Sequence, residues 1–147
     1  MIGDLCEAGM PSSVDLVAGA PYETDLLYHE EFVALQERFP VTFRYRTAIS
    51  RYTHADQPSK MYVQDQISQN ADELLAKLQS PRTLIYICGI AGMEIGVFQM
   101  LAEMLDPESL SQYLTIKAGT DPDPALWERS MIPRKLKPTK RMFLEVY

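Results

Sequence analysis

Three groups of residues in this sequence combine side chains that can bind an anion or a flat ring. The first, Cys88-Gly89-Ile90-Ala91-Gly92-Met93-Glu94, follows an apolar run. The second is Ser50-Arg51 together with Lys60-Met61-Tyr62, and the third is the C-terminal Glu145-Val146-Tyr147. Each group can act only where neighbouring strands and helices hold it in place.

The Cys-Gly group lies where a strand is expected to turn into a helix. The run from Thr83 to Cys88 is apolar at nearly every position, which predicts a buried parallel strand. A helix is expected from Met93 to Leu105. Backbone N–H groups and the dipole at such a helix start favour anions, and glycines let a ligand approach the backbone. The alternative is a small buried cysteine followed by a tight turn.

The second group lies at the two ends of a polar loop. Ser50 and Arg51 begin this loop after the alternating strand pattern of residues 41–49, and Lys60 and Tyr62 end it. A hydroxyl, a guanidinium, an ammonium and a phenol can converge on one phosphate, which the arginine can bind in a bidentate way. After a strand of a nucleotide-binding fold, such a set would select a 2′-phosphate. A solvated polar loop is the alternative.

The third group ends the chain. Residues 143–147 are rich in aromatic and β-branched types, which predicts a last strand. Open parallel sheets bind ligands at the carboxyl ends of their strands. Tyr147 is therefore either an ordinary edge residue or a ring placed over something flat.

Strand and helix patterns alternate along the chain, which predicts an α/β fold with a parallel sheet and helices on both faces. The strands are expected at residues 15–20, 41–49, 83–88 and 142–147, and the main helices at 24–39, 70–78 and 93–105. Short helices are expected near residues 107–114 and 124–130.

Composition limits the classes of function. The 147 residues, 46% of them apolar, predict one globular domain. The net charge of −6 argues against general nucleic-acid binding, and no apolar run has the length of a membrane span. Two cysteines, Cys6 and Cys88, favour a reducing cytoplasm. His29 and His54 have no Cys or acid at ligand spacing, so no metal site is expected.

Residues 134–141 hold five cations in a chain that is otherwise acidic. A solvated loop before the last strand is the favoured interpretation. Docking of an acidic protein partner is the alternative.

Taken together, these motifs resemble the NADP-binding domain of plant-type ferredoxin–NADP⁺ reductases. Five segments match in the same order, and the match covers roughly residues 15–105 and the last few. The matching segments are residues 19–32, residues 48–51 with 60–65, residues 71–74, residues 86–94 and residues 145–147. The stretch from about residue 114 to 141 matches poorly and is longer than in the family.

The resemblance implies roles for the polar loop. Ser50, Arg51, Lys60 and Tyr62 would hold the 2′-phosphate and adenosine end of NADP, with Gln64 in the same set. The ring of Tyr62 would stack on the adenine.

The resemblance also implies roles at the other two groups. Cys88 would lie beside the nicotinamide, Glu145 would join a proton and charge network near the flavin, and Tyr147 would stack on the flavin ring and give way to nicotinamide. These three are the expected catalytic residues. The cofactor-binding residues expected here are Gly89, Ile90, Met93, Glu94 and Tyr147.

The family has segments that this sequence lacks. Its FAD-binding β-barrel is absent, as are the first strand and Gly-rich turn of its NADP domain. In the family's strand order, 3-2-1-4-5, the absent strand lies between those expected here at 15–20 and 83–88. We therefore expect residues 1–147 to be an N-terminally truncated NADP-binding domain. Its two exposed strand edges should pair directly or drive self-association.

The activity implied is that of a flavoprotein reductase. Hydride would pass between NADPH and FAD, and electrons would pass to or from a ferredoxin-like iron–sulfur protein or a fused oxygenase partner. One alternative is a non-catalytic nucleotide-binding or assembly module. A weaker one is a small cysteine enzyme, which lacks a nearby His or Arg to activate Cys88.

Overall fold

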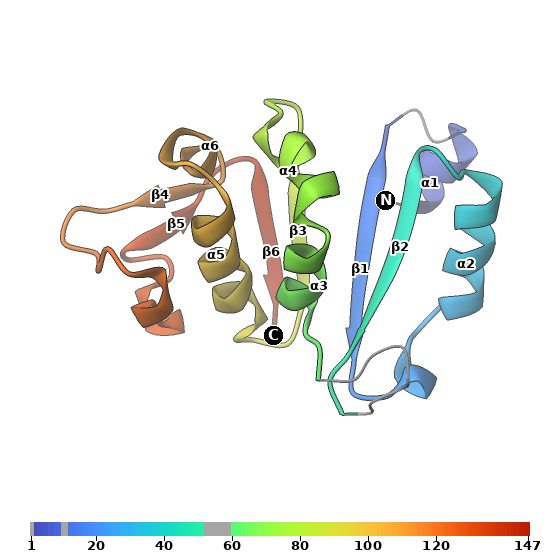
Figure 1. Ribbon diagram of the computed structural model, residues 1–147, viewed down its shortest axis with the longest axis horizontal. Helices are drawn as coiled ribbons and strands as arrows, with labels where there is room; N and C mark the ends of the chain where they lie inside the picture. The colour runs from blue at the N-terminus through green and yellow to red at the C-terminus, as the bar shows by residue number, and fades with distance from the viewer. Residues whose placement is uncertain (1, 10–11, 52–59) are drawn as a thin grey trace. The chain divides into compact units, whose positions relative to one another are not determined.

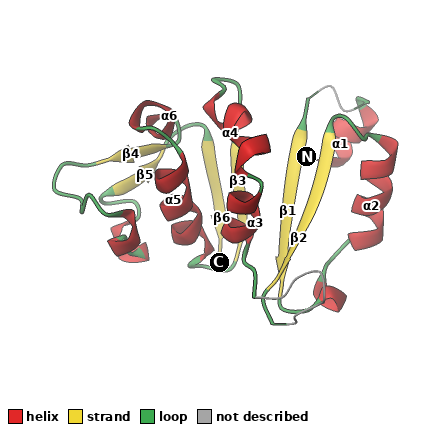
Figure 2. Ribbon diagram, viewed as in Figure 1, coloured by secondary structure: helices red, strands yellow, loops and turns green. Residues whose placement is uncertain are grey.

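The computed structural model describes residues 2–9, 12–51 and 60–147. They form two compact units, Met1–Ile67 and Ser68–Tyr147. Each unit contains one pair of parallel strands accompanied by helices (Figures 1 and 2). The predicted α/β class with parallel strands is therefore confirmed.

The first unit is built on the parallel pair of β1 (Val14–Ala20) and β2 (Phe43–Ile49). Apolar residues of α1 (Ile2–Glu7) and α2 (His29–Arg38) pack against the buried Phe43 and Tyr45 of β2. The helix α3 (Val63–Gln69) follows the polar loop, whose central residues 52–59, including His54, lie outside the described part of the chain.

Glycine at position 19 allows close packing on β1. A Cβ atom at Gly19 would lie 2.9 Å from Cγ1 of Val63, the first residue of α3. Glycine inside a strand often marks such an approach. It brings the helix after the polar loop against the carboxyl end of β1.

The helix expected at residues 24–39 is shorter in the structure. A 3₁₀ turn, η1 (Glu23–Asp25), comes first, and α2 begins only at His29. Tyr28 between them has φ 57°, in the left-handed region, which interrupts the helical path. The prediction of one helix over residues 24–39 is therefore wrong.

The second unit is built on the parallel pair of β3 (Ile85–Gly89) and β6 (Met142–Val146), in register from Ile85↔Met142 to Gly89↔Val146. The helix α5 (Met93–Met104) follows β3 after three intervening residues. The other elements are α4 (Ala71–Gln79), α6 (Pro107–Ser111), β4 (Leu114–Ile116), η2 (Pro124–Leu126), η3 (Arg129–Met131) and β5 (Leu136–Pro138).

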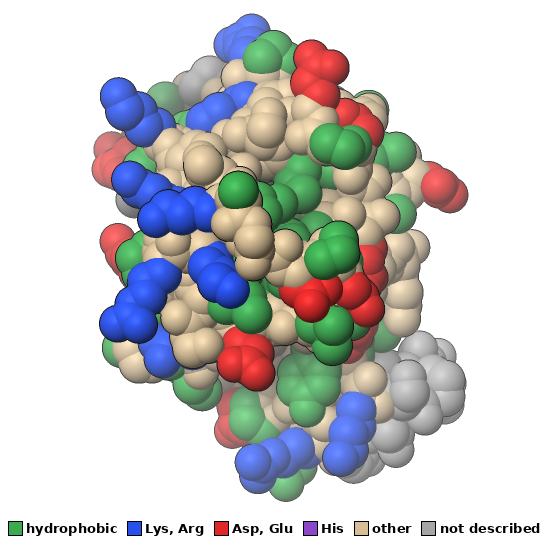
Figure 3. Space-filling model, turned by 90° about the vertical axis from the view of Figure 1, so that its left-hand side faces the viewer, with side chains coloured by type: hydrophobic (Ala, Val, Ile, Leu, Met, Phe, Trp, Pro, Cys, Tyr) green, Lys and Arg blue, Asp and Glu red, His purple; other side chains and the backbone are tan. Residues whose placement is uncertain are grey.

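The cationic segment 134–141 is not simply a loop. Leu136 within it is fully buried and lies in β5, which pairs antiparallel with β4. Arg141 donates to the carbonyls of Ser80 and Thr83 at 3.0 and 2.8 Å. The cations that remain exposed lie on the side of the molecule that carries β4 and β5, where Figure 3 shows several Lys and Arg side chains.

The two strands expected to flank an absent strand each have one strand partner in the described residues. β1 pairs with β2, and β3 pairs with β6. None of the described helices has both the length and the apolar character needed to cross a bilayer.

Candidate functional site

Cys88 and Glu145 are neighbours at the carboxyl ends of β3 and β6. The parallel register pairs these two residues directly, one step before Gly89 and Val146. Both side chains are exposed. The alternative of a small buried cysteine therefore does not hold, because the thiol is on the surface beside a carboxylate.

Tyr147 is tied to the same strand end by its backbone. Its N–H donates to the Gly89 carbonyl at 3.1 Å, and its own carbonyl accepts from the Ala91 N–H at 3.0 Å. Its ring is 84% exposed. The last residue is thus held at the main chain while its ring is open to solvent, as a residue that covers a flat ligand would require.

The turn from Gly89 to Gly92 has backbone that favours glycine at both ends. The φ angles are 152° at Gly89 and 108° at Gly92. A Cβ atom at Gly89 would lie 3.1 Å from Cε of Met93. Ile90, at the tip, is 78% exposed, so the predicted binding turn is accessible.

Glu94 is held inside the second unit instead of facing solvent. Only 2% of the residue is exposed. One carboxylate oxygen accepts the Gly92 N–H at 2.7 Å, and the other accepts Nε of Arg129 at 2.7 Å. Burial raises the pKa of the Glu94 carboxyl, but hydrogen bonds from its own backbone N–H, Arg129 and Gly92 outweigh burial and hold the pKa below its ordinary value.

Arg129 is a residue that the sequence did not reveal as part of this site. It lies in η3, 35 positions after Glu94, within the stretch where no family motif was recognised. An isolated arginine among the many cations near residue 130 gives no local signal. Only the folded chain brings it to the carboxylate.

The predicted phosphate-binding residues of the first unit lie at the carboxyl ends of β1 and β2. The N–H of Ser50 donates to the Ala20 carbonyl, and the N–H of Arg51 donates to the Pro21 carbonyl, both at 3.0 Å. The Arg51 side chain is exposed. The backbone is thus fixed while the side chain remains exposed.

The far end of the polar loop returns to the same strand. Met61 is buried, and its N–H donates to the Ile49 carbonyl at 3.0 Å. Its neighbours Lys60 and Tyr62 are exposed, with Tyr62 53% accessible. Gln64 is half-buried in the first turn of α3. Met61 therefore anchors the far end of the loop at β2, so Lys60 and Tyr62 lie near the strand end that Ser50 and Arg51 follow.

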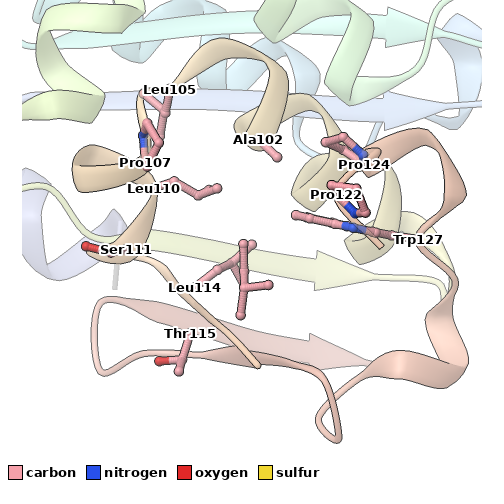
Figure 4. A pocket seen from close by; sticks show the side chains of 11 residues that line it. Ala102, Leu105, Pro107, Leu110, Ser111, Leu114, Thr115, Pro122, Pro124 and Trp127 are labelled. Carbon is pink, nitrogen blue, oxygen red and sulfur yellow. The ribbon is translucent and has the colours of Figure 1, made fainter. Parts of the chain in front are cut away.

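A pocket in the second unit lies away from the predicted site residues. It has a volume of about 460 Å³, and none of the predicted site residues lines it (Figure 4). Its walls are mainly leucine, proline and the buried Trp127, contributed by α5, α6, β4 and η2. A second cavity, of about 400 Å³, is lined by Glu94, Arg129, Ser130, Ile132, Leu144 and Val146.

The sequence profile of the family described as "Oxidoreductase NAD-binding domain" matches residues 2–99. The chain belongs to this family. The match spans both predicted binding segments, the polar loop after β2 and the Cys-Gly turn after β3. As an NAD-binding domain, the chain has these two segments at the carboxyl ends of parallel strands, where open α/β sheets bind their ligands.

Curated relatives of this NAD-binding domain include ferredoxin–NADP reductases. One from Spirulina sp is 48% identical over 82 residues, 56% of this chain. The chloroplastic leaf-type isozyme of Nicotiana tabacum is 37% identical over 65% of the chain, and the protein from Picosynechococcus sp. is 30% identical over 90%. They confirm the recognition of an NADP-binding domain of the ferredoxin–NADP reductase family. The chain covers 28%, 26% and 29% of the lengths of these three relatives.

Proposed function

We propose that this chain is the NADP(H)-binding part of an FAD-dependent oxidoreductase. The complete enzyme would move hydride between NADPH and FAD and exchange electrons with an iron–sulfur protein of the ferredoxin type or with a fused oxygenase. FAD would supply the ring that accepts hydride and releases single electrons. The residues of this chain would bind and orient the nucleotide.

The observation that carries this proposal is the arrangement at the carboxyl ends of β3 and β6. Cys88 and Glu145 are paired in register, and both main-chain groups of Tyr147 bond to the Gly89–Ala91 backbone. In our proposal the nicotinamide lies against Cys88 and the bare turn, and Glu145 supplies a charged group beside it. The exposed, tethered Tyr147 ring fits a role in covering a flat flavin or nicotinamide ring.

The adenosine end is assigned to the first unit. Arg51 and Lys60 are exposed at the end of β2, and Ser50 adjoins Arg51. A doubly charged 2′-phosphate matches a guanidinium with an ammonium nearby, and an exposed tyrosine such as Tyr62 can stack on adenine. We therefore propose a preference for NADP over NAD. We also propose a cytoplasmic setting, because a reducing compartment would keep the exposed Cys88 thiol free.

Binding measurements test the proposal directly. Calorimetric titration of the purified chain with NADP⁺ and with NAD⁺ should give clear binding of NADP⁺ and much weaker binding of NAD⁺. Equal affinity for both nucleotides, or no binding of either, would contradict the assignment. Visible absorption of the chain, alone and after co-expression with a flavin-binding domain of the same family, tests the redox role. NADP⁺ binding without flavin reduction when NADPH is added to the combined protein would favour the non-catalytic binding module.

A further inference from the structure

The Gly89–Gly92 turn is bonded to the rest of the second unit on two sides. On one side, the main chain of Tyr147 bonds to Gly89 and Ala91. On the other, the Gly92 N–H donates to the Glu94 carboxylate at 2.7 Å. The backbone torsions of Gly89 and Gly92 are ones that other residues rarely adopt, and glycine is conformationally free when unrestrained. Such a turn holds one geometry only if bonds of this kind fix it.

The Glu94 carboxylate can fix the turn only while it stays charged and correctly oriented. It is 2% exposed, and water therefore contributes little to its solvation. Removing one partner of a buried charge leaves that charge uncompensated, which is strongly unfavourable. The partner is Arg129, whose Nε lies 2.7 Å from the carboxylate oxygen that does not contact Gly92.

The two oxygens of Glu94 thus have different partners. One receives the N–H of the turn, and the other receives the guanidinium of η3. The arginine side chain is 56% exposed, so it is anchored at one nitrogen and accessible on the rest of its surface. Arg129 also lies outside residues 2–99, the part that matches the family profile. The contact therefore joins the part of the chain that follows the profile match to the Cys-Gly motif within it.

We propose that Arg129 is a positioning residue for the nicotinamide end of the nucleotide site. Acting through Glu94, it fixes the Gly92 N–H and with it the path of the Gly89–Gly92 turn beside Cys88. This inference rests on the proposed function, since it assigns the ligand of the turn. The physical link from Arg129 to Gly92 is open to measurement without any ligand.

The first measurement is amide hydrogen exchange of Gly92, followed by NMR in the full chain. Arg129→Ala should speed exchange at Gly92 by about tenfold, the scale of a lost hydrogen bond to a charged group. The amides of β1 in the first unit should exchange at the same rates as in the wild-type chain. Arg129→Lys keeps the charge without the Nε donor, so the exchange rate of the Gly92 amide should rise by only about threefold in this variant. Arg134→Ala removes an exposed cation from the same segment. It should change neither the exchange rate of the Gly92 amide nor the rates of the β1 amides.

The second measurement separates positioning from general stabilisation. Arg129→Ala should weaken binding of NADP⁺ by at least about threefold while leaving the affinity for adenosine 2′,5′-bisphosphate unchanged, because that fragment lacks the nicotinamide. Arg129→Lys should restore most of the NADP⁺ affinity. An equal loss of affinity for both ligands would show a merely structural role and overturn the proposal.

The exchange data decide the remaining cases. Unchanged exchange at Gly92 in Arg129→Ala would overturn the proposal whatever the binding data. If the wild-type chain binds no NADP⁺, the proposed function fails, and exchange at Gly92 still shows whether Arg129 holds the turn. If Arg129→Ala does not fold, Arg129→Lys carries the same test, and an exchange rate equal to the wild-type rate would overturn the proposal.

Discussion

At the scale of single residues, Arg51 is the side chain on which nucleotide choice should depend. Its backbone is fixed to Pro21 and its guanidinium is exposed at the end of β2. Arg51→Ala should weaken NADP⁺ binding by about tenfold to a hundredfold, the range for losing a charge-assisted pair, and leave NAD⁺ binding nearly unchanged. Calorimetric titration with both nucleotides measures this, with Arg82→Ala as an exposed-arginine control. If the variant discriminates as well as the wild type, Arg51 does not bind the 2′-phosphate.

Glu94 makes the stability of the second unit depend on pH. Its pKa is held below the ordinary glutamate value, so the folded state binds the proton less readily than the unfolded chain. The charged Glu94 carboxylate therefore stabilises the folded state fully above the ordinary glutamate pKa, about 4.3. This stabilisation is lost as pH falls from there through the pKa of Glu94 in the folded state. Asp106, whose pKa is lowered by hydrogen bonds from the Ser109 side chain and backbone, contributes in the same direction.

The pH dependence can be measured as the melting temperature between mildly acidic and strongly acidic buffers. The melting temperature should fall through this range, and Glu94→Gln should flatten the fall because the amide does not titrate there. Glu108→Gln, a change at an exposed position on α6, should leave the profile as it is in the wild type. If the melting temperature falls with pH equally steeply in Glu94→Gln and in the wild type, the role given to Glu94 is contradicted.

At the scale of elements, the sequence predicted regular strands and helices well and the breaks between them less well. The strands β1, β2, β3 and β6 were expected from apolar runs, from alternation or from aromatic and β-branched residues, and they are confirmed. Tyr28, which interrupts the helix expected at 24–39, has no such signal, because tyrosine seldom adopts a left-handed backbone. The strands β4 and β5 were missed because each has three residues and exists through its pairing with the other.

The Gly89–Gly92 turn gives a prediction at this scale. Gly92→Ala should destabilise the chain by roughly 1–2 kcal/mol, since φ 108° is unfavourable for a side chain even though no neighbour crowds the added Cβ. Gly3→Ala in α1 is a matched control, because it has equal space and no positive φ. It should be neutral or slightly stabilising. Denaturant unfolding of both variants measures the difference, and equal stabilities would remove the argument for strain at Gly92.

At the scale of the whole molecule, the main feature is strand edges without a strand partner in the described residues. β1 pairs with β2 and β3 pairs with β6, while parallel strands are usually found inside larger sheets. Open edges of this kind pair with other chains. We therefore expect the 147-residue chain to self-associate as its concentration rises, which sedimentation velocity would detect.

Two substitutions test whether the edge of β1 takes part in this association. Val17→Lys places a charge within β1 and should reduce self-association. Val41→Lys, at a position 85% exposed and outside the strands, should leave it unchanged. A chain that stays monomeric at all concentrations and melts in one cooperative transition would contradict the expected role of the edges.

The sequence by itself indicated the family and the two predicted binding segments, because these depend on local patterns. An apolar run followed by Cys88-Gly89 and a strand followed by Ser50-Arg51 can be read from neighbouring residues. Only the tertiary structure paired Cys88 with Glu145, closed the main chain of Tyr147 on the Gly89–Ala91 backbone and brought Arg129 to Glu94. These contacts join residues 35 or more positions apart. They depend on strand register and on the burial of a charge, which no local pattern encodes.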